Sequence, residues 1–182
     1  MLDAFYNQLK EDFNQERDRL EQFLKKTNPQ LLNESSIVAI RDFVLGMPEI
    51  IKVLNTLIMR QKLRPEARMV FGFLVSYLLD PQDLLPEETF GFFGYLDDAY
   101  LTARVAKWAL KDTPDADMEA FGLNPDAVSH YLALLERVKL FVPEDIKNQL
   151  NAVLKNVVDG ATMVSNHIDI NKIETDYFKN KS

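Results

Sequence analysis

Eight prolines divide this 182-residue chain, and most of the segments between them carry a helical pattern of apolar residues. Proline fixes its own φ angle and lacks a backbone N–H, so it suits the first turn of a helix and disrupts the interior. Between the prolines, apolar residues recur three and four positions apart, and no segment sustains the two-residue alternation of a strand. The sequence therefore predicts an all-α protein, a single globular domain over residues 1–182 built as a bundle of about seven helices.

The first predicted helix, residues 3–26, is long and amphipathic. Its apolar residues follow a heptad-like spacing that is interrupted only at Glu16. Such a stripe is typical of a helix that packs on its own domain. The alternative is a dimerisation arm, which gives self-association through the N-terminal helix. The stripe consists of Leu2, Tyr6, Leu9, Phe13, Leu20 and Phe23.

The middle of the chain predicts a helical hairpin. One helix is expected over residues 65–80 and the next over residues 94–110, joined by a turn-rich corner that contains Pro81 and Pro86. We expect the other helices to wrap around this hairpin. Gly46 and Pro48 are expected to end one of them and begin another. These outer helices are predicted over residues 35–45, 48–62, 125–141 and 143–158, with a short acidic turn near 114–122.

The charge of the chain is concentrated in the hairpin. The formal net charge is -7, and six of these charges lie between Arg68 and Arg104, an interval with six acidic residues and no Lys, Arg or His. The interval also contains eight of the nineteen aromatic residues. An acidic chain does not suit nucleic-acid binding, which needs clustered bases. The absence of cysteine excludes disulfides and cysteine-ligated metals.

Two motifs in this interval resemble a known family. Residues 77–86 read Tyr-Leu-Leu-Asp-Pro-Gln-Asp-Leu-Leu-Pro, and residues 94–99 read Gly-Tyr-Leu-Asp-Asp-Ala. Together they resemble the signature of the YkvA-like domain of unknown function, DUF1232, over about residues 68–112, with departures at Leu85 and Glu87. The resemblance implies a helical hairpin found in bacterial proteins, some of them membrane-associated, and implies no established activity.

The acidic residues of the two motifs have two interpretations. In the structural one, Asp83 caps nearby backbone N–H groups, and Asp97 and Asp98 interact with the dipole at a helix start. In the other, Asp83, Asp97 and Asp98 bind Mg²⁺ or Ca²⁺, which prefer oxygen ligands. Neighbouring helical residues point about 100° apart, which disfavours a shared ion for Asp97 and Asp98. The candidate binding residues of the motif are Asp80, Asp83, Tyr95, Asp97 and Asp98.

The aromatic residues of the corner are also open to two interpretations. They form either part of the core or a pocket or exposed patch for a lipid-like ligand, a protein or a membrane. In the membrane case, a short basic cluster would contact anionic lipid. The cluster consists of Arg60, Lys62, Arg64 and Arg68.

No complete catalytic constellation is present, and no residue is assigned a catalytic role. The N-terminus lacks the features of a secretory signal, so we expect a cytoplasmic protein, in part associated with a membrane. The expected function is that of a non-catalytic interaction or scaffold protein. The alternative is an enzyme or ligand-binding protein that uses the acidic hairpin with Mg²⁺ or Ca²⁺ as cofactor.

Overall fold

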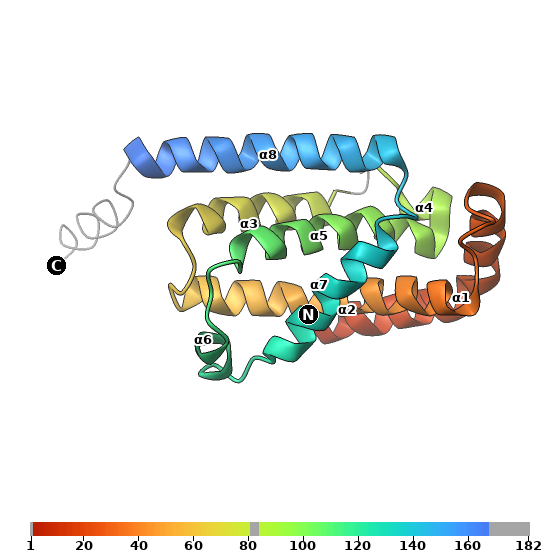
Figure 1. Ribbon diagram of the computed structural model, residues 1–182, viewed down its shortest axis with the longest axis horizontal. Coiled ribbons are helices and arrows are strands. Elements are labelled where there is room, and N and C mark those ends of the chain that lie inside the picture. The colour runs from red at the N-terminus through yellow and green to blue at the C-terminus, as the bar shows by residue number, and fades with distance from the viewer. Residues whose placement is uncertain (1, 81–83, 168–182) are drawn as a thin grey trace.

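The computed structural model describes residues 2–80 and 84–167, and all regular structure in these ranges is helical (Figure 1). The predicted all-α class is confirmed. Eight α-helices and one 3₁₀ helix follow one another in the described part of the chain. They are α1 (Leu2–Thr27), α2 (Glu34–Met59), α3 (Pro65–Leu78), α4 (Glu87–Phe90), η1 (Gly91–Gly94), α5 (Tyr95–Ala109), α6 (Asp115–Glu119), α7 (Pro125–Val138) and α8 (Glu144–His167).

Helix α5 lies at the centre of the bundle. It packs on α2 on one side and on α3 on the other, and α8 covers the outer side of α3 (Figure 1). Helix α7 crosses over α2 and also contacts α5. Four alanines allow these neighbours to approach α5 closely because an alanine side chain occupies little space. They are Ala99, Ala103, Ala106 and Ala109, all buried.

The hairpin of α3 and α5 forms as the sequence predicts, and its corner contains more helix than expected. After a short irregular stretch over residues 84–86, the corner consists of α4 and η1. Gly94 makes this tight arrangement possible. A methyl group on Gly94 would lie 2.7 Å from both the Leu85 carbonyl oxygen and the Glu87 Cα. The backbone of η1 therefore packs directly against the segment before α4.

The prediction of two helices separated at Gly46 and Pro48 is wrong, because a single helix, α2, covers both positions. It runs without interruption from Glu34 to Met59, with Pro48 buried in its interior. Gly46 serves close packing here, because a methyl group at this position would lie 2.7 Å from the Tyr131 ring of α7. The burial of the residues on both sides of Pro48 supports one long helix despite the lost backbone hydrogen bond.

Helix α1 packs on α2 and η1. Leu9, Phe13 and Leu20 of the predicted stripe are buried together with Leu24, whereas Tyr6 of the stripe is 41% exposed. The expected packing of this helix on its own chain is thus present. None of the helices in the described ranges is long and apolar enough to cross a bilayer.

Candidate functional site

Among the described acidic residues of the motif, Asp97 is the most deeply buried. It lies in the first turn of α5, where the helix dipole favours a negative charge, and its side chain has 0% exposure. The Tyr77 hydroxyl, from the last turn of α3, donates a hydrogen bond of 2.6 Å to Asp97 Oδ2. The same hydroxyl accepts a longer bond, 3.4 Å, from the Leu84 N–H. Tyr77 therefore joins α3, the end of the corner and α5.

Burial controls the protonation of Asp97. It raises the pKa of the carboxyl from 3.8 to about 6, and the hydrogen bond from Tyr77 offsets part of this rise. Negative charge on Glu87 adds a smaller increase to the pKa. Asp97 Oδ1 accepts no hydrogen bond from the described residues by distance and angle. An ionised carboxylate in this environment lowers the free energy of unfolding at neutral pH. Groups with perturbed pKa values of this kind are concentrated at functional sites.

Asp98 and Thr102 lie next to Asp97 in the interior. Asp98 is 3% exposed and Thr102 is fully buried. The two residues are four positions apart on α5 and so share one face of the helix. Within the described ranges, the Thr102 hydroxyl has no hydrogen-bond partner. Thr102 is not recognisable in the sequence as a site residue, because a lone threonine in a helix gives no distinctive signal.

Helix α1 supplies two acidic residues that the sequence analysis also missed. The Tyr95 hydroxyl donates a 2.9 Å hydrogen bond to Asp12 Oδ2, and burial is the main cause of a raised pKa for Tyr95. Glu16 accepts a hydrogen bond from the Phe92 N–H of η1. Gly91, with φ of +60°, leaves space for Glu16, since a methyl group there would lie 2.1 Å from the carboxylate oxygen. The interruption of the apolar stripe at Glu16 was the available signal.

The remaining acidic candidates do not converge on Asp97 within the described ranges. Asp80 is exposed just after α3, and its N–H donates to the Tyr77 carbonyl. Asp83 lies outside the described residues, so the predicted grouping of Asp83, Asp97 and Asp98 stays a prediction. No group of three His, Asp or Glu side chains in the described ranges is arranged to hold a metal ion.

The aromatic residues of the corner belong to the core. Phe92 and Phe93 are both about 1% exposed. The Phe92 ring meets Phe13 edge-on at a centroid distance of 5.0 Å, and Phe93 contacts Phe23 at 4.3 Å. Both partners come from α1, so the corner and the N-terminal helix bury each other. These contacts favour the core interpretation over an aromatic pocket.

The basic cluster is largely held by neighbouring side chains. The Arg64 guanidinium lies over Trp108, 4.5 Å from the ring centroid, and donates to the Trp108 carbonyl. Arg60 lies over Phe121, and Lys62 forms a 2.9 Å ion pair with Asp117. These contacts give Arg60, Lys62 and Arg64 a structural role, because each of the three packs on an aromatic ring or pairs with an acid.

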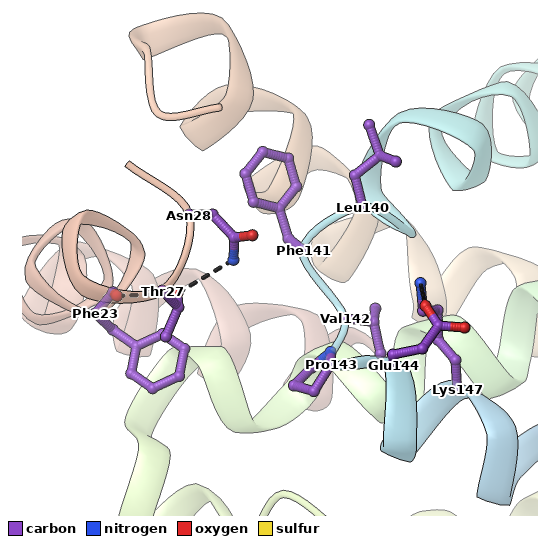
Figure 2. Close-up of a pocket in the computed structure, with 9 residues that line it drawn as sticks. All are labelled: Phe23, Thr27, Asn28, Leu140, Phe141, Val142, Pro143, Glu144 and Lys147. Atoms are coloured by element: carbon purple, nitrogen blue, oxygen red, sulfur yellow. Dashed lines mark hydrogen bonds and ion pairs between the residues drawn. The ribbon is translucent and has the colours of Figure 1, made fainter. Parts of the chain in front are cut away.

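Two neighbouring grooves open on a different face, where the connection between α7 and α8 passes the end of α1. One has a volume of about 320 Å³, and Figure 2 shows its Phe23 and Asn28 on the α1 side and Pro143 on the other. The second, about 350 Å³, lies beside the start of α2. Leu140 and Phe141 line both grooves, and Leu140 is 54% exposed.

Comparison with known proteins identifies only the central motif. Residues 67–103 match a family model described as a protein of unknown function (DUF1232). This match confirms the resemblance, although it ends at residue 103, before the expected limit at 112. It contains Tyr77, Asp97 and Asp98 and excludes α1. No curated protein and no solved structure gives a significant match.

Proposed function

We propose that this protein, with its DUF1232-like hairpin, is a non-catalytic interaction or scaffold protein. The burial of the motif carboxylates carries the proposal. Asp97 and Asp98 are 0% and 3% exposed, and Asp97 is engaged by Tyr77. Residues that act on a substrate must be reachable from a cleft, whereas Asp97 faces the contact between α3 and α5 and Asp98 is buried on the neighbouring side of α5. Their position supports a role in fixing the shape of the hairpin.

The surface that best suits a protein partner is the pair of grooves around Leu140. An exposed leucine between two hollows offers an apolar anchor, and protein interfaces gain most of their affinity from a few such anchors. The rims carry polar side chains, which include Asn33 and Arg137 of the second groove and Asn28 of the first. A partner with an apolar segment flanked by polar residues fits this arrangement.

A photo-crosslinking amino acid at Leu140 tests this function. In extracts of the source cells we expect one defined protein adduct, saturable by unlabelled protein and absent when the same group replaces exposed Lys155. As an unlabelled competitor for formation of this adduct, the Leu140→Asp variant should be at least tenfold less effective than the unmodified protein. Metal-dependent turnover that Asp97→Asn abolishes without unfolding the protein would contradict a non-catalytic role.

Cation binding is a second candidate, and it is favoured by the buried Asp97 Oδ1, which has no hydrogen bond of ordinary geometry from the described residues. Mg²⁺ binds through as few as one or two carboxylates with water completing its shell. If the ion binds the folded protein, millimolar Mg²⁺ or Ca²⁺ should raise the melting temperature by several degrees, and Asp97→Asn should remove this shift. Identical melts with and without each ion at pH 7.5 would reject cation binding.

We also retain peripheral membrane contact and self-association through α1 as proposals. The basic cluster would contact anionic lipid through the positive charges that Arg60 and Arg64 keep while they pack on aromatic rings. Flotation with vesicles of 30% phosphatidylserine tests the membrane contact, and Arg60→Gln with Arg68→Gln should weaken it. Recovery of all protein in the vesicle-free fraction would exclude the lipid contact.

Self-association would use α1, where Tyr6 is 41% exposed and is available to a second copy of the chain.

A further inference from the structure

One face of α3 is left uncovered by the described part of the molecule. The buried residues of this helix, such as Leu74, point into the bundle. On the other side Gly72 and Ser76 are exposed, and Leu79, directly after the helix, is 77% exposed. Residues 69–79 contain no charged side chain, although 27% of the whole chain is charged. An exposed helix face without charge suits contact with another protein surface.

No described contact within the chain requires a glycine at position 72. A glycine inside a helix costs about 1 kcal/mol of helix stability relative to alanine. A methyl group on Gly72 would meet no atom of the described residues within 4 Å apart from the backbone of its own helix. One turn later, the Ser76 hydroxyl donates a 3.0 Å hydrogen bond to the Gly72 carbonyl, so burial of Ser76 would leave no unpaired donor. The two small residues therefore allow a second helix to approach α3 closely.

Helix α8 extends this face on one side. It runs along α3 in the opposite direction and packs on both α3 and α5 (Figure 1). The Asn151 amide of α8 donates a 3.1 Å hydrogen bond to the Tyr100 hydroxyl of α5, which marks the side of α8 that faces α5. At about 100° per residue, Val153 and Gly160 lie within about 20° of the opposite side. Both are exposed, and a methyl group on Gly160 would likewise meet only its own helix within 4 Å among the described residues. The uncharged face therefore continues from α3 onto α8.

The order of residues on this face is self-complementary. A two-fold axis that crosses α3 at Leu74 pairs residues that lie equally far before and after this position. Gly72 and Ser76 are each two positions from Leu74, so Gly72 of one copy lies opposite Ser76 of the other. Met69 and Leu79 are each five positions away and form the outer pairs. Small residues thus meet at the crossing and larger apolar residues meet on both sides of it, as an interface between identical patches requires.

The charges at the two ends of α3 favour this antiparallel arrangement. Arg60 and Arg64 precede α3, and both keep their positive charge while they pack on aromatic rings. Asp80, exposed just after α3, and Glu87 at the start of α4 make the other end acidic. Antiparallel helices place the basic end of one copy beside the acidic end of the other and also oppose the two helix dipoles. A parallel arrangement would place like charges together.

We propose that α3 packs antiparallel on α3 of a second copy of this chain, with the two-fold axis at Leu74 and the flank of α8 beside it. The product is a homodimer in which α3 and α8 of each copy form a four-helix contact. This contact differs from self-association through α1. It also leaves the grooves beside Leu140 open, so it does not depend on the proposed function.

Sedimentation velocity of the full-length protein, from low to several hundred micromolar, tests the dimer. We expect the mass to rise with concentration toward twice the 21.0 kDa of one chain. Gly72→Gln should weaken dimerisation at least about tenfold, whereas the melting temperature of the dilute variant should stay the same or rise, because glutamine favours a helix. Leu79→Glu should weaken dimerisation similarly. Ser129→Gln, the same side chain at an exposed position of α7, should leave the dimer intact.

Single cysteines test the register, since the chain has no cysteine of its own. A mixture of Gly72→Cys and Ser76→Cys chains should form a disulfide-linked dimer under mild oxidation. Each variant alone should form it much more slowly, because identical positions are offset along the antiparallel helices.

Three results would overturn the proposal. The first is a monomer at the highest concentration. The second is a dimer that both Gly72→Gln and Leu79→Glu leave intact, which would place the contact on another face such as α1. The third is a disulfide that forms as fast in Gly72→Cys alone as in the mixture, which would show a parallel pair. If Gly72→Gln lowers the melting temperature of the dilute protein, Leu79→Glu decides in its place.

Discussion

At the scale of single residues, Asp97 combines full burial with a charge at neutral pH. Its pKa is about 6 in the folded protein and 3.8 for an unperturbed carboxyl. The folded state therefore binds the proton more tightly than the unfolded state does. The resulting stabilisation is complete below pH 3.8 and disappears as the pH rises through 6. Ionised Asp97 thus costs the fold at most about 3 kcal/mol at neutral pH, because each tenfold change in proton affinity corresponds to about 1.36 kcal/mol.

We expect Asp97→Asn to become more favourable relative to the unmodified protein as the pH rises from 4 to 8. The asparagine keeps an acceptor for Tyr77 and carries no charge to bury. The difference in the free energy of unfolding should move by about 2–3 kcal/mol in favour of the variant. Urea denaturation at a series of pH values measures it. Asp18→Asn, a change of an exposed aspartate on α1, should show no such trend. If the difference in the free energy of unfolding between the variant and the unmodified protein does not change with pH, Asp97 is not ionised in a buried position.

Tyr77→Phe tests the hydroxyl that joins α3, the corner and α5. Loss of its bonds to Asp97 and Leu84 should lower the free energy of unfolding by about 1–3 kcal/mol. The pKa of Asp97 should rise further, because the bond from Tyr77 favours the ionised form. Carboxyl carbon NMR follows that titration. Tyr6→Phe, at an exposed position of α1, serves as control. An unchanged Asp97 titration in Tyr77→Phe would refute this role of the hydroxyl.

At the scale of elements, two glycines differ in how closely their surroundings pack: Gly94 at the end of η1 and Gly72 in α3. Gly94 has ordinary helical angles, φ of -58° and ψ of -34°, so its necessity is steric and does not arise from backbone conformation. Its neighbours are backbone atoms of Leu85 and Glu87, which have little freedom to move. A methyl group added to the exposed Gly72 of α3 would have no atom of another residue within 4 Å apart from the backbone of its own helix.

These two glycines provide a matched pair of alanine substitutions. Gly94→Ala should destabilise the protein by about 2–3 kcal/mol, because the corner must move away from η1. Gly72→Ala should be neutral or stabilise by up to about 1 kcal/mol, since alanine favours the helix. Thermal and urea denaturation measure both. Equal effects of the two substitutions would show that the corner does not pack on Gly94 as described.

At the scale of the whole molecule, α1 completes the core over the corner. Phe13 is buried against Phe92, and Glu16 accepts a hydrogen bond from the same residue. The family match begins at residue 67 and thus omits the helix that covers its own motif. The hairpin in this chain consequently depends on a segment more than fifty residues earlier.

Phe13→Ala measures this dependence. It should cost about 3–5 kcal/mol in the free energy of unfolding, as expected for a buried phenylalanine. Tyr6→Ala, on the same helix and partly exposed, should cost about 1 kcal/mol or less. Both should be measured at two protein concentrations tenfold apart. An effect of Phe13→Ala that grows with dilution would indicate that this face of α1 packs on a second chain.

The sequence by itself determined the helical class, the hairpin and the concentration of charge in it. These properties depend on local periodicity, on proline and on residue order, which are all visible along the chain. The tertiary structure decided the rest. Helix α2 continues through Pro48 because its neighbours bury both halves. Asp12 and Glu16 join the motif only because α1 packs on η1. The burial that raises the pKa of Asp97 comes from residues distant in the sequence, and local pattern contains no information on such contacts.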